Sequence, residues 1–173
     1  MARHPLPAHL RFFSPAALIA TFFGAGLLKP ASGTWGSLAA LAPGLLIAER
    51  FGPSGLLISA AIAYGLGHWA STIWINGTAD KDPSPIVIDE VAGLWLTLTL
   101  APLTPLGIAL AFGLFRFFDI VKPWPVRWAD KNIGGATGIM LDDVLAGIWA
   151  ALVLLAAHEF ALILGIKGDK YVV

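Results

Sequence analysis

The stretch FRFFDIVKPWPVRWADKNIGGATGIMLDD at residues 115–143 lies between two long apolar segments and concentrates more charge than any other part of the chain. Polar residues gather wherever a membrane protein leaves the bilayer, and this accounts for most such loops. It does not account for Asp119 at the end of one apolar run, or for Asp142 and Asp143 at the start of the next. A carboxylate at the membrane boundary costs desolvation energy unless something compensates its charge. The stretch therefore predicts a membrane boundary that also carries a site.

The apolar segments on either side set the fold class. Hydrophobic residues make up 57% of the 173 residues and charged residues 13%, whereas soluble domains average about 45–50% and about 25%. Residues 55–75 would form a helix about 31 Å long, which can cross a hydrocarbon core of roughly 30 Å. The sequence predicts a single all-α domain over residues 1–173, a multi-pass membrane helical bundle.

Composition also excludes several classes of function. A formal net charge of zero argues against a nucleic-acid partner, because neutralising phosphates takes a clustered basic surplus. The chain contains no cysteine, which removes disulfides, thiolate metal sites and cysteine nucleophiles. The first fifteen residues contain three prolines and no continuous apolar segment, so we expect no cleavable signal peptide.

The N-terminal part predicts short or re-entrant segments. Residues 16–28 are too short to span comfortably, and LKPASGTWGS at residues 28–37 breaks regular structure. Both a re-entrant segment and a spanning helix fit this pattern. Glycine-rich backbone with hydroxyls, here including Thr34, can bind a phosphate through free N–H groups at a helix start. A simple turn is the alternative.

The rest of the chain predicts helices that bring its acids to one side. We expect helices at residues 37–48, 55–75, 86–100 and 106–118, and a last helix from Asp142 to about Ile166. Asp89 and Glu90 fall in the first turn of the third of these. Counting the membrane crossings of the successive helices places that pair on the same side of the membrane as residues 119–143.

Small residues predict close packing directly below the acids. Asp142 and Asp143 are each followed at four-residue spacing by alanine or glycine, and Asp89 precedes Gly93 by four. Residues four apart share a helix face, so each acid pair lies at the end of a face of small residues. Two such faces can approach each other closely, and this would bring the carboxylates of the two helices together. Carboxylates without thiolate or imidazole suit a hard cation such as Mg²⁺. The predicted metal ligands are Asp89, Glu90, Asp142 and Asp143.

Three blocks of the sequence resemble the signature blocks of the bacterial phosphatidylglycerophosphatase A family. They are GAGLLKPASGTWGSLAAL at residues 24–41, DPSPIVIDEVAGLW at 82–95 and FRFFDIVKPWPVRWADKNIGGATGIMLDDVLAGI at 115–148. The resemblance implies a magnesium-dependent inner-membrane phosphatase that converts phosphatidylglycerophosphate to phosphatidylglycerol. The family's acidic motifs carry over onto Asp89–Glu90 and Asp142–Asp143, with Asp119 and Lys122 as further site residues.

The residues themselves favour metal-assisted hydrolysis. Besides lacking cysteine, the chain has no DxDx(T/V) motif for an aspartyl-phosphate enzyme and no histidine in a polar block. A cation held by the acids would neutralise phosphate oxygens and activate water. The predicted catalytic residues are Asp89, Glu90, Asp142, Asp143 and Asp119, and the predicted phosphate-binding residues are Lys122, Lys29, Arg116 and Thr34.

Two other classes of protein fit the sequence less well. A small membrane divalent-cation transporter would also carry acids on small-residue helices, but transport sites usually lie near the bilayer midplane, whereas these acids cluster at helix ends. The motif of a CDP-alcohol phosphotransferase is not present. The expected partner is a phospholipid substrate in the bacterial inner membrane, and the oligomeric state stays open.

Orientation follows from the distribution of cations. We expect a cytoplasmic site, with the cytoplasmic cations Lys29, Lys81, Lys122, Arg127 and Lys131. Cation counting is indecisive if the N-terminus lies on the opposite side. It becomes decisive if residues 1–28 are re-entrant, because Arg3 and Arg11 then join the cytoplasmic set.

Overall fold

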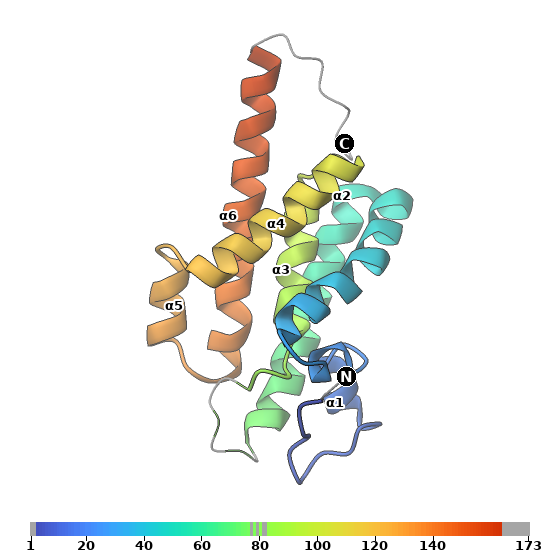
Figure 1. Cartoon of the computed structure of the whole chain (residues 1–173), viewed down its shortest axis with the longest axis vertical. Helices are drawn as coiled ribbons and strands as arrows, with labels where there is room; N and C mark the ends of the chain where they lie inside the picture. Colours follow the sequence, from blue (N-terminus) through green and yellow to red (C-terminus); the bar gives the residue numbers. More distant parts are fainter. Residues whose placement is uncertain (1–2, 77, 79, 81–82, 164–173) are drawn as a thin grey trace.

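The computed structural model describes residues 3–163 except 77, 79, 81 and 82. Its helices are α1 (Pro15–Ala20), η1 (Ala25–Leu27, a 3-10 helix), α2 (Ser32–Ile75), α3 (Ile88–Leu98), α4 (Pro105–Val121), α5 (Val126–Asn132) and α6 (Gly135–Ile163) (Figure 1). These residues form no β-strand beyond one isolated bridge between Arg3 and Leu28. The prediction of an all-α fold is confirmed. Lys81 and Ile166, which entered the predictions, lie outside the described residues.

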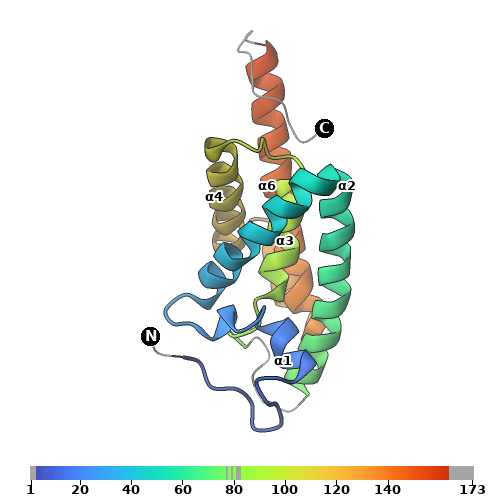
Figure 2. The same ribbon diagram turned by 90° about the vertical axis from the view of Figure 1, so that its right-hand side faces the viewer.

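Helix α2 consists of two arms joined by a sharp kink. Gly52 has φ 62° and ψ −162°, a backbone conformation that glycine adopts without steric cost, and Pro53 follows it. One arm therefore rises and the other descends (Figure 2). The two arms correspond to the two helices predicted on either side of Gly52–Pro53, but the first arm begins at Ser32 rather than at Ser37.

The N-terminal helices are short, as predicted. Helix α1 has six residues and η1 three, too few to cross a bilayer. Ser14 caps α1 by accepting a hydrogen bond from the Ala17 amide. Two helical stretches are long and apolar enough to span a membrane, namely α2 and residues 135–161 of α6.

Helix α3 lies at the centre of the fold, between α2 and α6 (Figure 1). Its contact with α6 is a glycine crossing: a Cβ on Gly93 would lie 2.5 Å from the Asp143 carbonyl oxygen, and one on Gly147 would lie 2.4 Å from the Gly93 carbonyl oxygen. On the other side, the Trp95 indole donates a hydrogen bond of 2.9 Å to the Ala40 carbonyl of α2. The predicted close packing below the acids is confirmed for Gly93 and Gly147, and it fixes the first turn of α3 beside α6.

Two boundaries differ from the prediction. Helix α6 begins at Gly135, seven residues before Asp142, because the apolar residues between them also pack inward and Ala136, Ile139 and Met140 are buried. The acids of α6 therefore lie about 10 Å along the helix instead of at its start. Helix α5 was not predicted: it buries only Val126 and Ala129, and one helical turn of apolar periodicity does not stand out in a charged segment.

Candidate active site

The predicted acids line one cavity of about 220 Å³ at the end of the bundle where α2 and α3 begin and α4 ends. Its charged walls come from α3, from the end of α4 and from α6, and the start of α2 with residues 83–86 completes it. The lining residues are Ala31, Ser32, Gly33, Pro83, Ser84, Ile86, Asp89, Glu90, Arg116, Asp119, Lys122, Asp142 and Asp143. We call this cavity the acid pocket.

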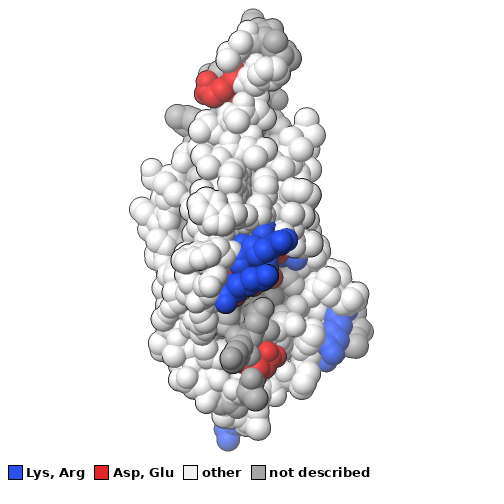
Figure 3. Space-filling view, turned by 90° about the vertical axis from the view of Figure 1, so that its left-hand side faces the viewer, with Lys and Arg blue, Asp and Glu red and all other residues white. Residues whose placement is uncertain are grey.

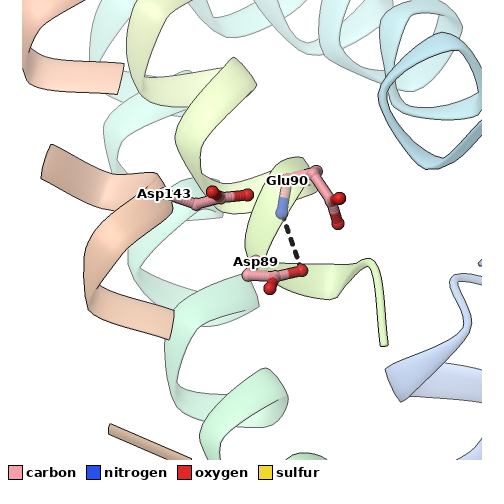
Figure 4. A group of neighbouring side chains, drawn as sticks. All are labelled: Asp89, Glu90 and Asp143. Carbon is pink, nitrogen blue, oxygen red and sulfur yellow. Dashed lines mark hydrogen bonds between the residues drawn. The ribbon is translucent and has the colours of Figure 1, made fainter. Parts of the chain in front are cut away.

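Three carboxylates converge in the acid pocket and form what we call the acid trio, Asp89, Glu90 and Asp143 (Figure 4). One oxygen from each lies within 4.8 Å of the other two. Asp89 and Asp143 are buried, with exposed fractions of 9% and 4%. The Glu90 amide donates to Asp89 Oδ1 at 3.0 Å, which orients that carboxylate in the first turn of α3.

The acid trio has unsatisfied oxygens. Asp143 Oδ2 and Glu90 Oε2 are buried and make no hydrogen bond. An unpaired buried polar atom costs about 1–3 kcal/mol, and more when it is charged. Three carboxylates supply only oxygen ligands, which is the donor set that Mg²⁺ and Ca²⁺ prefer. The trio therefore fits a hard divalent cation.

Asp142 lies apart from the trio, although it is adjacent to Asp143 in sequence. Lys122 Nζ lies 2.8 Å from Asp142 Oδ2 and 2.5 Å from Asp130 Oδ1, so the three residues form what we call the lysine cluster. Lys122 is the C-cap of α4 and has left-handed backbone angles, which turn the chain toward α5. Consecutive residues on a helix point about 100° apart, and α6 thus sends Asp143 to α3 and Asp142 to Lys122.

Arg116 bridges the pocket from α4. Its Nη1 lies 2.7 Å from Asp119 Oδ2 and 3.6 Å from Glu90 Oε1. These contacts are ion pairs by distance, but neither is aligned as a hydrogen bond, and the buried Nε atom also lacks a hydrogen-bond partner. The guanidinium is therefore held beside the trio by electrostatic attraction, and some of its N–H groups make no hydrogen bond.

The lining of the acid pocket is strongly acidic. Its five carboxylates face two cations, Arg116 and Lys122, a formal balance of two minus five, or −3. Burial raises the pKa of Glu90 to about 8, and the neighbouring Asp143 adds to the rise. Burial lowers the pKa of Lys122, but the hydrogen bonds that its ammonium donates to Asp130 and Asp142 outweigh that effect and raise the pKa overall. The trio thus has only the Arg116 guanidinium beside it, 3.6 Å from Glu90, whereas the lysine cluster contains a cation in direct contact with its acids.

The remaining predicted residues are placed as follows. Asp119, Arg116 and Lys122 line the pocket, but Lys29 and Thr34 do not, and Lys29 is exposed. His68 Nε2 lies 3.0 Å from the Thr137 hydroxyl oxygen. The sequence interpretation missed Asp130, because nothing in the spacing of a polar loop predicts which cation it meets.

Comparisons with known proteins point to one family. The family described as Phosphatidylglycerophosphatase A matches residues 18–158. A Phosphatidylglycerophosphatase A of Haemophilus influenzae is 39% identical over 154 residues, covering 88% of this chain and 94% of its own length. The Escherichia coli protein of that name is 37% identical over 151 residues, with coverage of 85% and 86%.

A third relative has a different name. A Bacteroides thetaiotaomicron protein named Putative phosphatidylinositol-3-phosphatase is 36% identical over 148 residues, covering 82% of this chain and 92% of its own length. No solved structure shows significant similarity to the chain.

Proposed function

Since the chain belongs to the phosphatidylglycerophosphatase A family and is therefore a phosphatase, we propose that it hydrolyses phosphatidylglycerophosphate to phosphatidylglycerol and phosphate with the help of Mg²⁺. The observation that carries this proposal is the convergence of Asp89, Glu90 and Asp143 with unsatisfied buried oxygens. Two cationic side chains line the same pocket, as binding of a phosphate dianion requires.

The acid trio would hold the cation. When bound there, Mg²⁺ would neutralise phosphate oxygens and lower the pKa of an attacking water. In the reaction, the water oxygen bonds to phosphorus and the bond from phosphorus to the glycerol oxygen breaks. The glycerol oxygen keeps the electron pair of that bond and takes up a proton that the water gives up. Arg116 and Lys122 would offset the charge on the phosphoryl oxygens, since preorganised positive charge is worth most in a buried site.

Asp119 and Asp142 have supporting roles in this proposal. Asp119 contacts the Arg116 guanidinium, and Asp142 contacts the Lys122 ammonium. Each carboxylate therefore fixes a cation that would otherwise be free to turn away from the phosphate. We assign Asp142 to holding Lys122 instead of to the metal, although the sequence pattern grouped it with the ligands.

The membrane orientation stays part of the proposal. Figure 3 shows Lys and Arg side chains gathered on the face that carries α5, with a wide uncharged zone above them. Arg127 and Lys131 of α5 are exposed, and Trp128 of the same helix is 53% exposed. Cations and tryptophans at one level are typical of the cytoplasmic boundary of a membrane protein. A site at this level can receive the headgroup of a bilayer phospholipid from the inner membrane.

A divalent-cation transporter remains the alternative from another class. The structure offers it little support, because α3 and α6 touch at Gly93 and Gly147 directly beside the acid trio. Leu94 and Leu98 of α3 are fully buried beyond that contact. The name of the Bacteroides relative makes an inositol phospholipid phosphate a second candidate substrate.

The decisive experiment measures phosphate release by the purified protein in detergent. Phosphatidylglycerophosphate, phosphatidylinositol 3-phosphate and soluble glycerol 3-phosphate would be compared, each with Mg²⁺ and with EDTA. We expect magnesium-dependent release from phosphatidylglycerophosphate above the other two. Release that persists in EDTA would remove the metal from the proposal. Cation flux in proteoliposomes without release from any lipid would favour the transporter.

A further inference from the structure

The first turn of α2 leaves two backbone amides free. Among the described residues, the amides of Ser32 and Gly33 have no hydrogen-bond partner. The next two amides, of Thr34 and Trp35, donate to the Ala31 carbonyl at 3.0 and 3.2 Å. Ala31 is the N-cap residue and has no side chain that could cap the helix. A helix start with free amides carries partial positive charge and binds anions.

These amides lie at the acid pocket. Ala31, Ser32 and Gly33 form one of its walls. A Cβ on Gly33 would lie 2.1 Å from Glu90 Oε1 and 3.1 Å from both terminal nitrogens of Arg116. Only glycine allows the start of α2 to approach those side chains so closely. The long helix α2 therefore begins directly against the predicted catalytic residues.

Two side chains in the same pocket independently point to a ligand. Asp143 is 4% exposed and its Oδ2 has no hydrogen-bond partner. The Arg116 Nε is also buried without a hydrogen-bond partner. An unpaired carboxylate oxygen lacks a cation, and an unpaired guanidinium nitrogen lacks an anion. A phosphate that enters together with a cation would satisfy both, as well as the free amides.

We propose that the amides of Ser32 and Gly33 bind the non-bridging oxygens of the phosphate monoester in the acid pocket. This inference rests on the proposed function and names the element that recognises the phosphate. Thr34, the residue that the sequence suggested, does not supply this contact, because its amide is already bonded to Ala31. The phosphate lies in the acid pocket against the start of α2, with Arg116 beside it. Inorganic phosphate, the product, occupies the same place.

The test follows the two amides directly. Protein labelled with ¹⁵N-serine and ¹⁵N-glycine in detergent micelles is titrated with inorganic phosphate in the presence of Mg²⁺. We expect saturable shifts of the Ser32 and Gly33 resonances, with the Ser32 signal assigned by its loss in Ser32→Ala. Gly65 and Gly113, which have open space around them, serve as reference signals that stay in place. If phosphate leaves the Ser32 and Gly33 resonances unchanged at concentrations that inhibit the enzyme, or does not bind at all, the inference is wrong.

A matched pair of variants adds a functional measurement. Gly33→Ala places a methyl group against Glu90 and Arg116, whereas Gly65→Ala makes the same change in the other arm of α2, where nothing lies within 4 Å. We expect Gly33→Ala to weaken inhibition by inorganic phosphate at least about tenfold and Gly65→Ala to leave it unchanged. Normal inhibition of Gly33→Ala would contradict the inference. Magnesium-dependent release from the lipid by the unmodified protein tests the proposed function separately, so the two can fail independently.

Discussion

Asp142 and Asp143 are neighbours on α6, yet the structure gives them opposite electrostatic surroundings. Asp143 joins Asp89 and Glu90 in the acid trio, where no cation comes close enough to satisfy its free oxygen. Asp142 joins the lysine cluster, where Lys122 contacts it at 2.8 Å. In the proposed function the trio takes a cation from solution, whereas the lysine cluster already contains one. The difference teaches that two acids adjacent in sequence can separate, one into a group of carboxylates and the other into a contact with a lysine.

The largest effect is expected from removing charge in the trio. Asp143→Asn should lower turnover by about 10³-fold, because an amide holds a divalent cation poorly and the activation of water depends on that cation. Phosphate release at saturating Mg²⁺ measures the loss. The same change relieves repulsion among buried carboxylates, so the melting temperature in EDTA should stay the same or rise. A variant that kept a tenth of normal turnover would place the cation elsewhere.

The next effect tests whether Asp142 belongs to the lysine cluster. Asp142→Asn should raise the KM for the lipid about 10-fold to 100-fold, because it removes a charged hydrogen bond to Lys122 worth about 1.5–3 kcal/mol. The Mg²⁺ concentration that gives half-maximal activity should change little. Both constants come from phosphate-release assays in which lipid and Mg²⁺ are varied separately. A tenfold rise in the Mg²⁺ requirement would make Asp142 a metal ligand, as the sequence pattern predicted.

The separation of these two acids shows where the sequence stops being informative. The acids in the first turn of α3 and the glycine contact below them follow from four-residue spacing, so the meeting of α3 and α6 could be predicted. The division between Asp142 and Asp143 depends on the rotation of α6 and on where α4 ends, and spacing in one helix contains neither. The pairing of Lys122 with Asp130 depends on α5, whose seven residues show too little periodicity to predict a helix.

The start of α2 shows the same limit in another form. The glycine-rich segment could be recognised as a candidate phosphate-binding turn, and its hydroxyls drew attention to Thr34. Which amides stay free depends on the exact first residue of the helix, and boundaries are uncertain by a few residues when assigned from sequence. A start at Ser37 would have left Gly33 in a loop. Because the helix starts at Ser32, the Gly33 amide belongs to its first turn and lies at the acid pocket.

A smaller effect is expected of pH on the binding of Mg²⁺, and it should depend on the acid trio and not on the lysine cluster. The pKa of Glu90 is raised to about 8 by burial and by Asp143, so without a cation Glu90 holds a proton below that pH. Mg²⁺ must displace the proton to bind. Its apparent affinity should therefore rise as the pH increases from about 6.5 to about 8.5, by at most about tenfold per pH unit for one displaced proton. The rise of the melting temperature caused by Mg²⁺ measures binding at each pH without requiring activity. Asp142→Asn should keep this pH dependence, and Glu90→Gln should weaken it without abolishing it, because burial also raises the pKa of Asp89. An equal loss in both variants would remove the distinction between the clusters.

The smallest effect concerns Asp130, the outermost member of the lysine cluster. Its side chain is 33% exposed and that of Lys122 is 25% exposed, and ion pairs in such partly solvated places contribute about 0.2–1 kcal/mol. Asp130→Asn should therefore raise the KM for the lipid at most about fivefold, and leave both turnover at saturating lipid and the Mg²⁺ requirement unchanged. Glu49→Gln, which removes a charge from an exposed position of α2, is the matched control and should have no effect on the KM.

Because Asp142 still contacts Lys122 in the Asp130 variant, the double variant Asp130→Asn/Asp142→Asn should lose more than the product of the two single effects. Strictly multiplicative losses would mean that the two acids do not act through one lysine, and the lysine cluster would then not be a functional unit.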